Sequence, residues 1–400
     1  MQELPRIISV DDHVLEPPDL WYSRLPAAVR DTGPRVQRMR MRRGSATGWV
    51  PDPDGEWCDV WLYGNVVAPL MMLQAAAGFE KLTMELTTFD DVRPGSWKQH
   101  ERLADMDLDH IEASICFPNT LPRFCGQTFL EQDDKDLGFL CVRAYNDWMI
   151  DEWSAGEGRG RLVPLGIVPL WDPELAAAEV RRSAGKGCHA VSFTESPVPL
   201  GLPSLYDKDR FWDPFFQACN DTDTIVCMHI GSSSRMPTTA PDAPMIVGMA
   251  LDWQNAVGSL TDYLMSGTLE RFGNLKVAYS EGQVGWMPYI LERIDKVWAE
   301  FNGEEFSNTV TVPPSTLARG RVFGCIFDDE TGLRNREAIG MDQICFETDY
   351  PHSQSTWPGS KDHLERLCAK AGLSENERFK LARGNAISAF GLDRFGINPS

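Results

Sequence analysis

Eight short apolar runs divide the chain, and nearly every one is followed by a segment with the apolar spacing of a helix. Such runs are typical of strands that are buried on both faces of a parallel sheet. They are Ile7–Val10, Ala113–Phe117, Leu162–Pro169, His189–Glu195, Thr224–His229, Leu275–Glu281, residues 322–327 and Gln343–Asp349. Eight strands that alternate with helices can close into a barrel. We therefore predict an α/β fold, a (β/α)8 TIM barrel. An open doubly wound sheet is the alternative, but no glycine-rich phosphate loop follows Val10.

Residues 14–96 interrupt this alternation and form a long insertion after the first strand. Its apolar part, Val66–Ala77, would suit a helix or a cap. Insertions of this length often build part of an active-site lid, and a peripheral subdomain or a subunit contact is the alternative. We expect residues 1–400 to form one domain, because α/β barrels commonly exceed about 250 residues.

Composition excludes several classes of protein. Hydrophobic residues make up 42% of the chain, with 13 Trp and 19 Phe, which is ample for a large core. No apolar run is long enough to cross a bilayer, and no secretory signal is visible, so a cytoplasmic protein is expected. The ten cysteines form no C-x-x-C pair and are expected to be reduced core residues. A net charge of −20 argues against binding to nucleic acids or anionic membranes.

Residues that can bind metals stand at the carboxyl ends of five predicted strands. They are Asp11 and His13 after the first strand, Glu195 after the fourth, His229 after the fifth, Glu281 after the sixth and Asp349 after the eighth. In a barrel these ends meet at one mouth, where active sites lie. Each residue alone could be a helix cap or a loop residue, but their joint position predicts a metal-dependent site. Imidazole with several carboxylates suits iron or manganese better than a structural zinc.

Two further features refine this site. Asp11 and His13 lie two residues apart on a strand, so both face one ion while Asp12 faces elsewhere. His352, three residues after Asp349, is the best candidate for an additional nitrogen ligand or an acid/base group. Its structural alternative is a hydrogen bond that orients the loop.

Three motifs resemble a known family: the Asp-x-His of Asp11–His13, the His-x-Gly of His229–Gly231, and the Thr-Asp-Tyr-Pro-His of Thr348–His352. The resemblance is to the amidohydrolase superfamily, in its aminocarboxymuconate-semialdehyde-decarboxylase-like (amidohydrolase-2) branch. It implies one divalent metal held by Asp11, His13, His229 and Asp349. That branch also has a sixth-strand histidine as acid/base, and here the position carries Glu281.

The departures at Asp11 and Glu281 resemble the TIM-barrel non-heme dimetal monooxygenases, such as the 2-aminoisobutyrate hydroxylase subunits and the diterpenoid hydroxylase of platensimycin biosynthesis. In dinuclear members of the superfamily a fourth-strand carboxylate bridges the metals, which implies that Glu195 spans two ions. We expect Glu281 to bind the second ion. An electrostatic argument agrees, because Asp11, Glu195, Glu281 and Asp349 would leave excess negative charge around a single ion.

The leading expectation is therefore a non-heme Fe/Fe or Fe/Mn monooxygenase that hydroxylates an unactivated C–H bond. It would require O₂, an electron donor and a small-molecule substrate, which by resemblance includes CoA-linked compounds. The first alternative is a single-metal hydrolase or decarboxylase with Zn or Mn, in which Glu281 or His352 transfers protons. The second is a non-catalytic metal-binding subunit. A homo- or hetero-oligomer is expected in each case.

Overall fold

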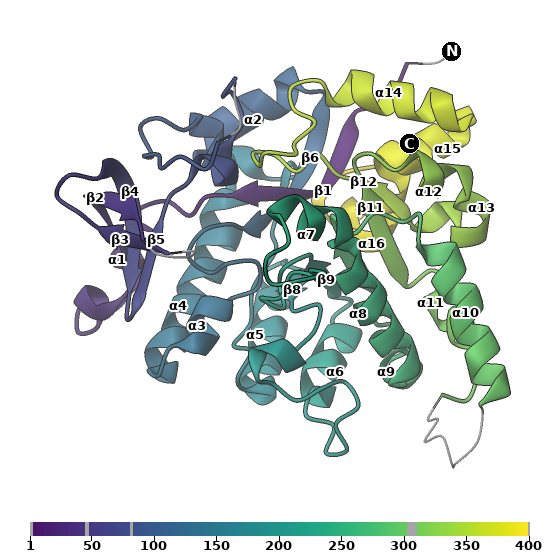
Figure 1. Cartoon of the computed structure of the whole chain (residues 1–400). Helices are drawn as coiled ribbons and strands as arrows, with labels where there is room; N and C mark the ends of the chain where they lie inside the picture. The colour runs from purple at the N-terminus through teal and green to yellow at the C-terminus, as the bar shows by residue number, and fades with distance from the viewer. Residues whose placement is uncertain (1–2, 45–47, 81–82, 302–309, 399–400) are drawn as a thin grey trace.

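Eight parallel strands form the centre of the molecule (Figure 1). The computed structural model describes residues 3–44, 48–80, 83–301 and 310–398. The barrel strands are β1 (Ile7–Val14), β6 (Ile111–Pro118), β7 (Leu162–Val163), β8 (Ala190–Phe193), β9 (Ile225–His229), β10 (Val277–Ser280), β11 (Val322–Ile326) and β12 (Ile344–Phe346). Each of them coincides with one of the eight apolar runs.

The strands close into a barrel through two junctions. The order β1-β6-β7 is followed by β8-β9-β10-β11-β12, and a parallel bridge between Gly166 and Val191 joins the two groups. On the other side, Asp349 N donates to Asp11 O at 3.0 Å and His13 N donates to Tyr350 O at 2.7 Å. These bonds connect the chain after β12 to β1, so the predicted α/β TIM barrel is confirmed.

Helices surround the barrel in Figure 1. They are α2 (Gln99–Leu108), α3 (Gln127–Glu131), α4 (Lys135–Trp148), α5 (Pro173–Gly185), α6 (Asp213–Asp221), α7 (Met245–Leu251), α8 (Trp253–Met265), α9 (Thr268–Arg271), α10 (Met287–Glu300), α11 (Pro314–Ala318), α12 (Glu330–Arg334), α13 (Arg336–Ile339), α14 (Ser360–Ala371), α15 (Glu375–Phe379) and α16 (Asn385–Phe390). Helix α5 shows how the sequence sets a boundary. Asp172 caps it by accepting from Glu174 N and Leu175 N, both at 3.0 Å, and Pro173 occupies the first turn, where no backbone donor is needed.

The segment after β1 contains a separate antiparallel sheet beside the barrel, at the left of Figure 1. Helix α1 (Leu20–Arg24) precedes the sheet. The sheet consists of β2 (Arg35–Arg43), β3 (Trp49–Pro51), β4 (Glu56–Tyr63) and β5 (Val66–Pro69), in the order β3-β2-β4-β5. The apolar run 66–77 begins as strand β5 because Gly64, at φ +56°, makes a two-residue hairpin with β4. A 3-10 turn, Met72–Ala75, follows. The lid role of residues 14–96 stays a prediction.

Many of the apolar side chains are buried in a core. The described core includes a large cluster between barrel and helices and a second cluster that contains Ile8, Val10, Ile115 and Leu165. All ten cysteines are free and buried, as expected for reduced core residues. Within the described ranges, every helix is too short or too polar to cross a membrane.

Candidate metal centre

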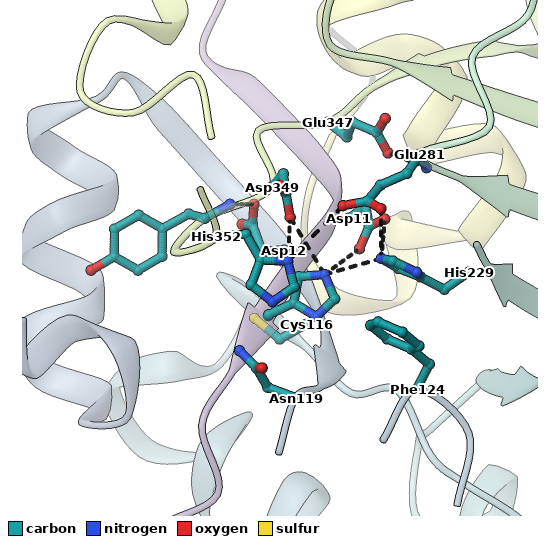
Figure 2. A network of polar contacts seen from close by, with 12 residues as sticks. Asp11, Asp12, Cys116, Asn119, Phe124, His229, Glu281, Glu347, Asp349 and His352 are labelled. Atoms are coloured by element: carbon teal, nitrogen blue, oxygen red, sulfur yellow. Dashed lines mark hydrogen bonds and ion pairs between the residues drawn. The ribbon is translucent and has the colours of Figure 1, made fainter. Parts of the chain in front are cut away.

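Six of the seven predicted site residues converge at the carboxyl ends of the barrel strands (Figure 2). Asp11 and His13 come from β1, and His229 is the last residue of β9. Glu281 follows β10 directly, while Asp349 and His352 lie in the loop after β12. Below, these six residues are called the cluster. It forms because each strand places its polar end at the same mouth of the barrel.

The inner part of the cluster has the spacing of ligands around one ion. The Nε2 atoms of His13 and His229 are 3.1 Å apart. Asp11 Oδ1 lies 3.7 Å from His13 Nε2, and Asp11 Oδ2 lies 3.5 Å from His229 Nε2. Asp349 Oδ1 is 3.5 Å from His13 Nε2. Ligands that bind one ion at about 2.0–2.2 Å lie about 3.0–3.6 Å from one another. The side chains of Asp11, His13 and His229 are close enough to share one cation, and Asp349 adjoins them through its contact with His13.

Asp11 shows most directly that a cation fits there. The residue is fully buried, and neither carboxylate oxygen has a hydrogen-bond donor within the described part of the chain. Burial, and then the charges of Glu347, Glu281 and Asp349, raise the pKa of Asp11 well above its ordinary value. An ionised carboxylate without donors is unfavourable in a buried site, and a bound cation removes that cost.

The two imidazoles differ in what holds them: a backbone hydrogen bond orients His229, whose pKa is raised because the effect of burial is outweighed by Glu281, and burial favours the neutral form of His13. His229 Nδ1 donates to the Ile230 carbonyl oxygen at 2.6 Å, which leaves the lone pair of Nε2 facing the cluster. Burial, followed by repulsion from His352 and His229, holds the pKa of His13 well below its usual value. Two imidazoles and two carboxylates are a donor set that suits manganese, iron or zinc.

Glu281 and His352 form the outer part of the cluster. Glu281 Oε2 lies 3.6 Å from His229 Nε2. His352 Nδ1 lies 3.0 Å from Asp349 Oδ1 and 4.0 Å from Glu281 Oε1, and its ring stacks on His13 at 3.6 Å. Burial opposes protonation of His352, but Asp349 and Glu281 outweigh it and raise its pKa to about 9. These two carboxylates therefore favour the protonated form of His352 in the metal-free site.

Glu195 is the predicted site residue that the structure does not bring into the cluster. Its Oε1 accepts hydrogen bonds from Gly231 N, Ser233 Oγ and Asn255 Nδ2 at 3.0, 2.8 and 2.9 Å. We call this arrangement the Glu195 cradle. These donors already satisfy the oxygen. A metal-bridging role for Glu195 stays a prediction.

Several residues that position the ligands carried no clear signal in the sequence. The buried Arg102 donates to the His13 carbonyl oxygen at 2.5 Å, and Thr348 Oγ1 donates to Asp12 Oδ1, also at 2.5 Å. Phe124 stacks on His229 at 4.1 Å. Asp12 thus faces away from the cluster, as predicted, and fixes the strand instead. Phe124 comes from an irregular loop, where no periodic pattern could have identified it.

A cavity of about 390 Å³ lies beside the cluster. His352 forms part of its wall, together with Trp357 and with residues 76–80 of the insertion. Ala77 N donates to Pro351 O at 3.0 Å, which fastens the insertion to the loop that carries His352. The volume is within the range of small-molecule sites. A larger cavity of about 920 Å³, between the loop at Tyr206 and the end of α10, is lined by none of the cluster residues.

Comparison with known proteins gives both curated relatives and solved structures. The chain is 25% identical over 318 residues to a gamma-resorcylate decarboxylase of Rhodococcus jostii (strain RHA1), covering 74% of this chain and 88% of the relative. An amidohydrolase from Mycobacterium avium subsp. paratuberculosis K-10 superimposes with a TM-score of 0.71 at 21% identity, over 97% and 99% of the two chains.

A dihydroxybenzoic acid decarboxylase from Polaromonas sp. JS666, solved with bound manganese and the inhibitor 2-nitroresorcinol, gives a TM-score of 0.63 at 19% identity, over 98% of both chains. At these identities the likeness of the structures shows the TIM-barrel fold.

These relatives correct the leading expectation from the sequence. The prediction of an O₂-activating dimetal monooxygenase is wrong, because curated relatives and solved neighbours are decarboxylases. Two iron ions, O₂, an electron donor and a CoA-linked substrate likewise find no support. The physical reason lies in the charge count. The four carboxylates that called for a second ion do not meet at one point, because Glu195 lies outside the cluster with hydrogen-bond donors of its own, and the imidazoles of His229 and His352 lie against Glu281.

A sequence model of the amidohydrolase family matches residues 48–392, which is most of the chain. The barrel and the cluster at its mouth agree with that match. The chain belongs to the amidohydrolase family.

Proposed function

We propose that this protein is a decarboxylase that uses one divalent metal ion, with Mn²⁺ as the first candidate, to act on small aromatic carboxylic acids. The observation that carries the proposal is Asp11, a buried carboxylate with no donor in the described ranges, whose oxygens face the Nε2 atoms of two imidazoles. The identity of the reaction is supported by the gamma-resorcylate decarboxylases among its relatives, and Mn²⁺ by the manganese bound in the Polaromonas enzyme.

We assign Asp11, His13, His229 and Asp349 as the metal ligands. The fit rests on their mutual spacing and on the unpaired oxygens of Asp11. When bound, the ion supplies a positive charge that neutralises these carboxylates and polarises substrate oxygens. Arg102 and Asp12 hold β1 in place, and Phe124 covers one face of His229.

His352 is the residue that we assign to proton transfer. It contacts Asp349 through Nδ1 and also lines the cavity, so its ring stands between the cluster and the substrate space. As the carbon–carbon bond to the carboxylate breaks, its electron pair stays on the ring carbon and CO₂ leaves. The proton of the His352 imidazolium then forms the new C–H bond, and solvent restores that proton.

The cavity wall suggests which part of the chain selects the substrate. Phe79 of the insertion and Trp357 of the loop after β12 both line the cavity, and aromatic walls suit a planar ring. We expect Phe79→Ala to raise KM about tenfold and to weaken binding of 2-nitroresorcinol similarly, with Mn²⁺ affinity unchanged. Unchanged binding of that probe would assign the insertion to a peripheral subdomain.

The decisive experiment follows carbon dioxide. The Mn²⁺-loaded protein is incubated with 2,6-dihydroxybenzoate and other hydroxybenzoates in D₂O, and released CO₂ and ring deuterium are measured. We expect one deuterium per CO₂, no O₂ consumption, and no reaction without metal. If the metal-loaded protein released no CO₂ but cleaved esters or amides, the chain would be a hydrolase and the proposal would be wrong.

A further inference from the structure

Glu281 has a backbone conformation that its residue type disfavours. Its φ is +59°, in the left-handed region that is unfavourable for residues with a Cβ. The turn occurs at the residue directly after β10, and it directs the carboxylate toward His229, with Oε2 at 3.6 Å from Nε2. Because Glu281 is not a glycine, the surroundings must stabilise the turn.

The group that stabilises it is the carboxyl of Glu347. Glu281 N donates to Glu347 Oε2 at 3.1 Å, and Figure 2 shows the two residues side by side. The same oxygen accepts from Cys325 Sγ at 2.5 Å, and Cys325 Sγ is also 2.9 Å from Tyr279 O. Glu347 therefore connects the ends of β10, β11 and β12 behind the cluster.

The buried Glu347 carboxyl would only destabilise the fold if it had no role beyond structure. Glu347 is fully buried, and its other oxygen, Oε1, has no hydrogen-bond partner in the described ranges. A buried carboxyl with an unmatched oxygen destabilises the fold compared with an apolar residue of similar size. The Glu281 N–H has left the strand ladder at the turn, and it requires an acceptor that an apolar side chain cannot provide.

We infer that Glu347 is a positioning residue, which holds the left-handed turn at Glu281 and thereby keeps the Glu281 carboxylate against the metal cluster. The inference rests on the proposed metal site. The alternative is that Glu347 is itself a ligand. Among the described residues, two groups of side chains are close enough to share an ion; one of them contains Glu281, and neither contains Glu347.

The test is a double-mutant cycle on Mn²⁺ affinity, measured by the electron paramagnetic resonance signal of free Mn²⁺. The variants are Glu281→Gln, Glu347→Leu, their combination, and Glu347→Gln, which keeps an oxygen for the Glu281 N–H. We expect Glu281→Gln and Glu347→Leu each to weaken binding about tenfold. The combination should be within about twofold of Glu281→Gln alone, and Glu347→Gln within about threefold of wild type.

Three results would overturn the inference: additive losses in the combination, a loss in Glu347→Gln as large as in Glu347→Leu, or unchanged affinity in Glu281→Gln. If Glu347→Leu does not fold, the rate of hydrogen exchange at the Glu281 amide tests the inference instead. It should be slow in wild type and in Glu347→Gln, and fast exchange in wild type would contradict the inference. Neither readout depends on CO₂ release, so a protein that binds Mn²⁺ without decarboxylation would refute the proposed function alone.

Discussion

Asp11 and Glu195 are two buried carboxylates at the same mouth of the barrel, and their surroundings are opposite. Glu195 Oε1 receives four hydrogen bonds, from Gly231 N, from both N and Oγ of Ser233, and from Asn255 Nδ2. Asp11 receives none within the described residues and faces two imidazole nitrogens instead. Position at a strand end is therefore insufficient to identify a ligand. What distinguishes the two carboxylates is whether the protein itself satisfies their oxygens.

The largest effect should follow from changing the unsatisfied carboxylate. Asp11→Asn removes the charge and half of the acceptor capacity between His13 and His229, so we expect Mn²⁺ affinity to fall by about 100-fold or more, with loss of turnover. Metal content after dialysis measures it. His189→Ala is the matched control, because His189 bonds to Thr222 O at the start of β8, away from the mouth, and should keep its metal. Full metal content in Asp11→Asn would show that Asp11, like Glu195, is not required as a metal ligand.

The next effect separates proton transfer from metal binding. His352→Gln should lower kcat by about 10²–10⁴-fold and leave the metal content near that of wild type, because His352 contacts Asp349 without being one of the four assigned ligands. Steady-state kinetics on metal-loaded protein check this. Loss of the metal together with activity would make His352 a fifth ligand.

Mn²⁺ binding should depend on pH through Asp349. In the metal-free protein, burial and then Glu281 raise the pKa of Asp349 to about 7. Below that pH the Asp349 carboxyl holds a proton that the ion must displace, so affinity should rise by up to about tenfold per pH unit through pH 7, and the raised pKa of Asp11 adds to this rise. Titrations between pH 5.5 and 8.5 would show it, and a flat profile would mean that Asp349 is ionised in the metal-free protein as well.

The smallest effect should come from Glu195→Gln. Glutamine keeps an oxygen for the donors of the Glu195 cradle, so Mn²⁺ affinity should stay within about threefold of wild type and the free energy of unfolding should change by about 1 kcal/mol or less. Denaturant unfolding and metal titration measure the two quantities. A large loss of Mn²⁺ affinity in Glu195→Gln would show that Glu195 is a metal ligand.

The fold and most of the cluster could be predicted from the sequence for one reason. The strands of a parallel barrel are continuous apolar runs, so the polar residue that ends each run marks the mouth. Asp11, His13, His229 and Asp349 are read directly from that rule. His352 followed from its short distance in sequence to Asp349.

The rest depended on contacts that sequence spacing does not encode. The loop after β9 folds back so that Gly231 and Ser233 reach Glu195, and no pattern in the chain indicates this return. Glu347 lies two residues before Asp349 but was hidden inside an apolar run, and its partner Glu281 comes from another strand. The run at Val66 was ambiguous between helix and strand, and the hairpin glycine, Gly64, decided it.

The closure of the barrel determines when the protein can bind its metal ion. Asp11 and His13 are synthesised more than 300 residues before Asp349, and the backbone bonds Asp349 N–Asp11 O and His13 N–Tyr350 O bring them together. A nascent chain on the ribosome therefore carries no complete site until the last strand has emerged. The complete metal site therefore forms only after β12 and the loop that carries Asp349 have been made, and a product truncated before β12 would lack that ligand.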